Sequence, residues 1–119
     1  MTAQARAAVW IDHHTARVFH VYLESFDETT LKAPIHHVHR HPEDEQHFFA
    51  DVAKALEPSE EILLLGPSTA KNQFVKYLNE HAPALAGRVA AVETSDHPSD
   101  AEIVAHVKSH FRIPPPRLR

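Results

Sequence analysis

The 119-residue sequence contains no cysteine and only two glycines, Gly66 and Gly87. Without cysteine there are no disulfides, thiolate metal sites or cysteine nucleophiles, a composition typical of cytoplasmic proteins. Two isolated glycines exclude the glycine-rich phosphate loops of dinucleotide-binding and P-loop proteins. No apolar run approaches the roughly 18 residues of a membrane span, and residues 1–12 lack the apolar core of a signal peptide. We therefore expect a cytoplasmic protein with no membrane partner.

Histidine, in contrast, is abundant. The chain has 12 histidines, as many as its lysines and arginines together, and its net charge is −4 when the histidines are neutral. Because histidine ordinarily titrates near a pKa of about 6.5, mild acidification moves this charge strongly toward positive values. The mean charge therefore neither favours nor excludes an anionic partner.

The rest of the chain is organised around residues 62–65, an unbroken run of one isoleucine and three leucines. Such a run without polar alternation predicts a strand that is buried on both faces, as in a parallel sheet. A glycine–proline pair ends the strand, and Ser68 or Thr69 is placed to cap the following helix, which extends to residue 81. The helical periodicity places Lys71 and Lys76 on its outer side.

The remaining elements supply partners for this central strand and helix. Strands are expected at residues 7–11, 16–23, 29–39 and 88–93, with helices at residues 42–57 and 99–111. The first three strands form an antiparallel meander, and right-handed crossovers then extend the sheet. The pattern predicts a ribonuclease-H-like α/β fold: a mixed five-stranded sheet in the order 3-2-1-4-5 with helices on both faces. We expect one domain over residues 1–113 and a proline-rich basic tail over residues 114–119.

The densest histidine cluster lies in the segment IHHVHRHP. On a strand, His37, His39 and His41 fall on one face with about 6.5–7 Å between successive residues, where imidazoles can hold zinc or another transition metal. His20 on the neighbouring strand is placed to join them. The alternative is a polar edge strand whose histidines discourage pairing with other chains. Apart from such a metal, no cofactor is expected.

Two further clusters have competing interpretations. Asp12 ends the first strand, where an Mg²⁺-dependent nuclease of this fold would place a carboxylate, but Glu93 and Asp96 are expected to lie too far away to complete a metal site. The alternative role of Asp12 is that of a turn residue. Ser68 and Thr69 stand at a helix N-terminus, which either accepts an anion such as phosphate or is capped by its own side chains. No nucleophile–base pair follows from spacing, so we expect no enzymatic activity.

Three phrases of the sequence resemble a known family: VWIDHHTARVFHV, GPSTAKNQFVKYL and HAPALAGRVAAVETSDHPSD. In this order they resemble the small bacterial proteins often labelled "translational machinery protein", which are related to the central domain of archaeo-eukaryotic release factors and Pelota. The resemblance covers most of residues 7–111. It implies a translation-associated role.

Release factors hydrolyse peptidyl-tRNA through a Gly-Gly-Gln loop between the third strand and the first long helix. Here this junction, HHVHRHPEDEQHFF, has no glycine, and its one glutamine is Gln46 within the predicted helix.

The resemblance therefore predicts a non-catalytic protein that binds the ribosome or RNA, as Pelota-type proteins bind ribosomes without the glutamine motif. The expected phosphate contacts are basic side chains of the central helix and the C-terminal segment, which has no acidic residue after Glu102: Lys71, Lys76, Arg112, Arg117 and Arg119. The alternatives are a histidine-rich binding protein responsive to metal or pH, and an Mg²⁺-dependent nuclease that uses Asp12. A homo-oligomer formed through an exposed sheet edge is compatible with all three.

Overall fold

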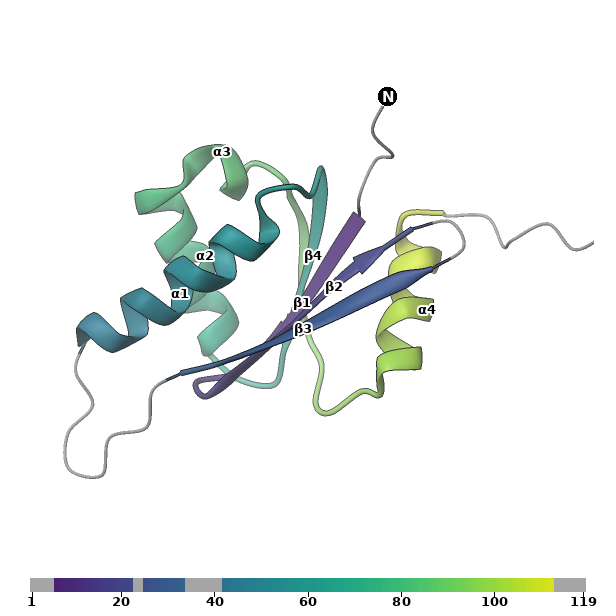
Figure 1. Ribbon diagram of the computed structural model, residues 1–119, viewed down its shortest axis with the longest axis horizontal. Coiled ribbons are helices and arrows are strands. Elements are labelled where there is room, and N and C mark those ends of the chain that lie inside the picture. The colour runs from purple at the N-terminus through teal and green to yellow at the C-terminus, as the bar shows by residue number, and fades with distance from the viewer. Residues whose placement is uncertain (1–5, 23–24, 34–41, 113–119) are drawn as a thin grey trace, which may run out of the picture.

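The computed structural model describes residues 6–22, 25–33 and 42–112, which form a single sheet with helices on both sides (Figure 1). The elements in chain order are β1 (Arg6–Ile11), β2 (Thr15–Val21), β3 (Phe26–Lys32), α1 (Pro42–Leu56), β4 (Glu61–Gly66), α2 (Ala70–His81), α3 (Pro83–Ala86), β5 (Val89–Thr94) and α4 (Asp100–His110). The sheet has the strand order β3-β2-β1-β4-β5. The predicted α/β fold and strand order are confirmed.

Strand β4 lies inside the sheet, as its sequence predicts. It pairs in parallel with β1 on one side and with β5 on the other. Ile62 and Leu64 face one hydrophobic cluster, and Leu63 and Leu65 face the other. All four side chains are buried. A strand with apolar residues on both faces is stable only where both faces are covered, and this requirement places β4 between the helical layers.

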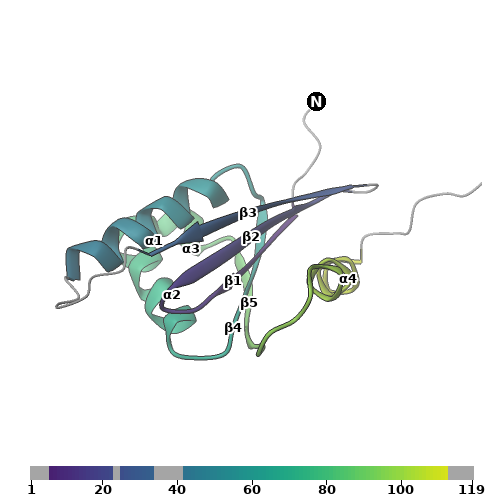
Figure 2. The same cartoon turned by 60° about the horizontal axis from the view of Figure 1, so that its bottom comes forward.

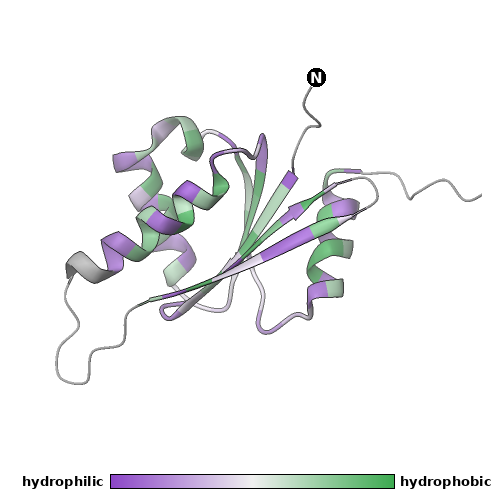
Figure 3. Ribbon diagram, viewed as in Figure 1, coloured by the Kyte–Doolittle hydropathy of each residue, from purple (hydrophilic) through white to green (hydrophobic). Residues whose placement is uncertain are grey.

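The helices divide between the two faces of the sheet. Helices α1 and α2 cover one face through Phe49, Phe74 and Leu78, and α4 covers the other through Ile103 and Val107. Figure 2 shows α4 on the opposite side of the sheet from α1 and α2. Hydrophobic and hydrophilic residues alternate along these helices (Figure 3), as expected when one side of a helix packs on a sheet and the other meets solvent. Within the described ranges, no helix combines the length and apolarity needed to cross a membrane.

The third strand differs from the prediction. It begins at Phe26, three residues earlier than expected, and runs to Lys32. The backbone N–H of Tyr22 donates to the Ser25 carbonyl at 2.8 Å, and Phe26 then pairs with Val21. Strand β3 therefore begins earlier than predicted, because pairing with β2 brings Asp27 and Glu28, whose strand propensities are low, into the sheet. The predicted continuation over residues 34–39 lies outside the described residues.

Gly66 stands where β4 comes closest to the end of β1. A Cβ atom added at Gly66 would lie 2.3 Å from the carbonyl oxygen of Ile11, a backbone atom, whereas a Cβ at Gly87 would lie 3.6 Å from its nearest neighbour. Only Gly66 is thus required by a close approach of two backbones.

We predict that Gly66→Ala lowers the free energy of unfolding by about 1–3 kcal/mol, because the new methyl group must displace backbone in a packed sheet. Gly87→Ala is the matched control and should change stability by no more than about 1 kcal/mol, since its φ is negative and the added methyl group makes ordinary contacts. Urea unfolding of both variants tests the difference. Equal losses would contradict the assigned close approach.

Helix α4 begins with a complete capping box. The Ser99 hydroxyl accepts from the Glu102 amide at 3.2 Å, and the Glu102 carboxylate accepts from the Ser99 amide at 2.9 Å. The hydrogen bond from the Ser99 backbone amide lowers the pKa of Glu102 below its ordinary value of 4.5. The carboxylate form is therefore favoured by folding.

Because the pKa of Glu102 is lower in the folded chain, the contribution of its charged form to stability is present above the unfolded pKa and is lost as the pH falls through the folded pKa. We predict that wild type is more stable than Glu102→Gln at neutral pH and that this difference shrinks on acidification. Ser99→Ala, which removes the hydroxyl cap, should instead lower stability by about 1 kcal/mol at neutral pH. Urea unfolding at several pH values measures both effects, and a pH-independent difference between wild type and Glu102→Gln would contradict the first.

Candidate functional site

The turn between β4 and α2 carries the residues that the sequence predicts for anion binding. Thr69 is the N-cap of α2, but no side chain caps the helix amides. The Thr69 hydroxyl instead lies 3.4 Å from Nε2 of His13. The Ser68 hydroxyl oxygen is shielded from solvent and forms no hydrogen bond within the described residues. The prediction that Ser68 or Thr69 caps the helix is therefore wrong, because neither hydroxyl forms a hydrogen bond with a helix amide.

Lys71 does not point outward from α2, in contrast to the prediction. Only 8% of its surface is exposed. Its ammonium group reaches back along the helix and donates to the Ser68 carbonyl at 2.7 Å. A long aliphatic stem lets a lysine bury its carbon atoms while its charge finds an acceptor, so helical periodicity alone does not fix its exposure. In this arrangement Lys71 holds the β4–α2 turn in place.

The two other predicted phosphate contacts that the structure describes, Lys76 and Arg112, lie on different elements from this turn and from each other. Lys76 is exposed on α2 and lines a cleft of about 390 Å³ between α1 and α2, where it is joined by Glu45 and Glu80. Arg112 is exposed just beyond α4, the helix that covers the other face of the sheet. The predicted contacts Lys71, Lys76 and Arg112 are thus not brought together in one site. Arg117 and Arg119 lie outside the described residues.

Asp12 acts as a turn residue. Its carboxylate oxygen Oδ1 accepts hydrogen bonds from the backbone amides of His14 at 2.8 Å and Thr15 at 2.7 Å. Glu93 is bound to His106, and Asp96 lies 3.7 Å from His97. In the part of the chain that the structure describes, no three histidine or acidic side chains are close enough to hold a metal ion. The nuclease interpretation therefore has no metal cluster to support it in these residues.

The predicted histidine cluster of His37, His39 and His41 lies outside the described residues. His20, which was expected to join it, has its Nδ1 atom 3.1 Å from a carboxylate oxygen of Asp27 on β3. In this arrangement Nδ1 of His20 is paired with Asp27 and is not available to bind a metal ion. Metal binding by the cluster stays a prediction.

Sequence reasoning missed the residues that position the connection between β5 and α4. The Trp10 indole donates to the carbonyl oxygens of Ser95 at 3.2 Å and Asp96 at 2.9 Å. It also missed His106, whose Nε2 atom lies 2.6 Å from the Glu93 carboxylate. Spacing gives no signal for these pairs, because they form only when α4 docks on the sheet. The signal available in the sequence was Trp10, the single tryptophan of the chain, because a buried indole N–H usually finds a hydrogen-bond acceptor.

No protein-family model matches the sequence, and no curated protein sequence is similar to it. Solved structures, in contrast, share its fold. The Pelota protein of Thermoplasma acidophilum superposes with a TM-score of 0.71 at 16% sequence identity, over 93% of this chain and 35% of that one.

Two further structures extend the comparison. An archaeal translation termination factor matches with a TM-score of 0.66 at 14% identity, over 92% of this chain and 35% of that one. Dom34 of Saccharomyces cerevisiae, a termination-like factor involved in RNA quality control and interacting with Hbs1, matches with a TM-score of 0.56 at 16% identity, over 91% and 37%. The chain thus spans about a third of the length of these proteins. At such low identity the likeness shows that the chain shares the fold of one part of Pelota-like and termination factors.

Proposed function

We propose that the chain is a non-catalytic, translation-associated protein that binds the ribosome or its RNA. The observation that carries the proposal is the fold shared with Pelota over 93% of the chain. The sequence phrases that resemble the small bacterial "translational machinery" proteins point in the same direction, and we place the chain with that group. We infer that residues 1–113 form the binding domain and that residues 114–119 are a basic tail.

Peptidyl-tRNA hydrolysis is not part of the proposed function. The segment before α1, where release factors carry their Gly-Gly-Gln loop, contains no glycine. Gln46 lies within α1, on the helix that begins at Pro42. A glutamine fixed in a regular helix lacks the flexible glycine-bearing loop that would bring its side chain to a distant ester bond.

The proposed contacts to ribosomal phosphates are the exposed side chains of Lys76 and Arg112, together with Arg117 and Arg119 of the inferred tail. Lys76 is exposed on α2 and Arg112 just beyond α4, and these two helices cover opposite faces of the sheet. We infer that RNA or protein surrounds the domain on two sides, as in a ribosomal cavity. Lys71, whose ammonium is bound within its own turn, has a supporting role next to Ser68 and Thr69.

The first test is sedimentation of the full chain through a sucrose gradient with ribosomes from its native host. We expect co-sedimentation at low salt that weakens as salt rises, because phosphate contacts release counterions. Lys76→Gln and Arg112→Gln should each reduce binding a few-fold. Each should also reduce the slope of log K against log salt concentration by about one, the value for one lost phosphate contact. Lys54→Gln, which removes an exposed lysine of α1, is the charge-matched control and should bind like wild type. Complete absence from ribosomal fractions at low salt, in growing and starved cells, would overturn the proposal.

A stability measurement separates the two lysines of α2. We predict that Lys71→Met lowers the free energy of unfolding by about 1.5–3 kcal/mol, because the Ser68 carbonyl loses a charged donor. Lys76→Met should change it by less than about 0.5 kcal/mol, since Lys76 is exposed. Thermal or urea unfolding measures both. Equal stability of the two variants would show that the Lys71 hydrogen bond does not support the turn.

A further inference from the structure

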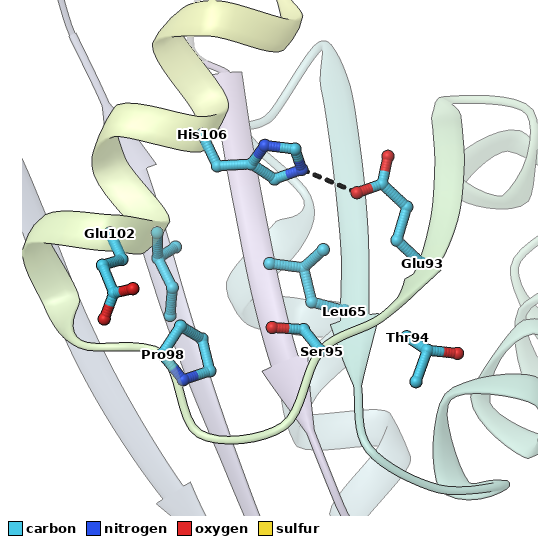
Figure 4. A pocket seen from close by; sticks show the side chains of 8 residues that line it. Leu65, Glu93, Thr94, Ser95, Pro98, Glu102 and His106 are labelled. Carbon is cyan, nitrogen blue, oxygen red and sulfur yellow. Dashed lines mark hydrogen bonds and ion pairs between the residues drawn. The ribbon is translucent and has the colours of Figure 1, made fainter.

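A cleft of about 300 Å³ opens at the carboxyl ends of β4 and β5, under the first turns of α4. Its wall is apolar where Leu65, Pro98 and Ile103 meet, and its polar side chains include Glu93, Glu102 and His106. Figure 4 shows His106 reaching from α4 toward Glu93 of β5, with Leu65 between the two elements. The volume is at the lower end of the range for small-molecule sites.

The cleft lies where the connections that follow two neighbouring strands diverge to opposite faces of the sheet. After β4 the chain enters α2 on one face of the sheet, and after β5 it enters α4 on the opposite face. In open α/β sheets, ligands bind preferentially in the crevice outside the carboxyl ends of two neighbouring strands that diverge in this way. The amide of Ser95 donates to the Gly66 carbonyl at 2.9 Å and so joins the two strand ends beside the cleft.

The loop that closes the cleft is held by side chains from β1 and β2. The Trp10 indole binds two of its carbonyl oxygens. The Arg17 guanidinium donates to the Pro98 carbonyl at 3.0 Å and pairs with Asp100. A site whose walls are fixed before binding loses little conformational entropy when it is filled, so this cleft is prepared for a ligand.

The charges around the cleft favour a cation. Glu93 and Glu102 both line it, and the described residues that line it include no lysine or arginine. The capping box occupies the Ser99 and Glu102 amides at the N-terminus of α4, so these amides are not offered to an anion. The carboxylate of Glu93 receives one hydrogen bond from His106. An ionised carboxylate offers about four acceptor positions, so a ligand ammonium can bind beside the imidazole.

We propose that this cleft binds a small alkylammonium or alkylguanidinium cation, with its apolar stem against Leu65 and Ile103 and its charged head on the carboxylate of Glu93. The ligand is a free amine of low molecular mass. A lysine side chain in a partner polypeptide carries the same chemistry, and the experiment below distinguishes the two sources. Neither Lys76 nor Arg112, the two proposed phosphate contacts that the structure describes, lines this site, so its occupation is tested separately from ribosome binding.

The test is a titration of the full ¹⁵N-labelled chain, followed by NMR, with butylammonium as the probe. We expect saturable shifts concentrated in the amides of residues 93–106. Butanol, which has the same stem without the charge, should bind about tenfold more weakly, because the charge-assisted hydrogen bond is absent. A short peptide with one central lysine, blocked at both ends, is titrated in parallel. Tighter binding of the free amine than of the peptide supports a small-molecule ligand, and the reverse order would overturn that source.

Variants then locate the charge. Glu93→Gln should weaken butylammonium binding about tenfold, and Glu93→Asp, which keeps the charge on a shorter side chain, should have an intermediate effect. Asp51→Asn removes the same charge from the exposed surface of α1, on the other face of the sheet, and should leave binding unchanged. The proposal is overturned if butanol binds wild type as well as butylammonium does, or if Glu93→Gln and Asp51→Asn have equal effects. The comparison of the two probes needs only the wild-type chain, so it decides the question even if a variant fails to fold.

Discussion

The fold depends on the burial of β4 between two strands and two helical layers. Its four apolar side chains from Ile62 to Leu65 alternate between the two hydrophobic clusters of the protein. Full burial of each such side chain contributes about 1.5–3 kcal/mol, and this gain is available only if both faces of the strand are covered. The parallel neighbours β1 and β5 satisfy its backbone groups along both edges. The close contact between Gly66 and the Ile11 carbonyl then fixes how β4 leaves the sheet.

Among the described helices, α4 covers the second face of β4, and polar contacts reinforce that packing. Trp10 and Arg17, on β1 and β2, bind the loop that precedes α4. The Arg17 guanidinium also lies over the rings of Trp10 and Phe19. Such contacts join residues more than 80 positions apart in sequence. The same contacts that dock the helix therefore also shape the cleft beside Glu93 and His106.

The arrangement of charge bears on how such a domain meets a large partner. Lys76 and Arg112 are separated by the sheet, and acidic side chains border Lys76 in the cleft between α1 and α2. Under the proposed function, a partner that contacts both Lys76 and Arg112 therefore approaches from more than one direction. The sheet edges offer a different kind of surface. On β3 the edge carries Asp27, Glu28 and Lys32, and charged side chains of this kind discourage pairing with other strands. On β5 the edge is largely uncharged, with Val92 exposed.

The sequence by itself determined the element order, the strand order and the central position of β4, because hydrophobic periodicity and chain connectivity are local signals with few solutions. It also offered the turn role of Asp12 as one of two alternatives, and the hydrogen bonds to the His14 and Thr15 amides decided for it. Only the tertiary structure decided that Lys71 is buried, that Ser68 and Thr69 leave α2 uncapped, and that β3 begins at Phe26. It likewise brought Glu93 to His106 and Trp10 to Ser95. These contacts depend on which hydrogen-bond acceptor or neighbouring strand lies close to a side chain once the elements have packed. The spacing of residues in the sequence does not encode such distances between remote segments.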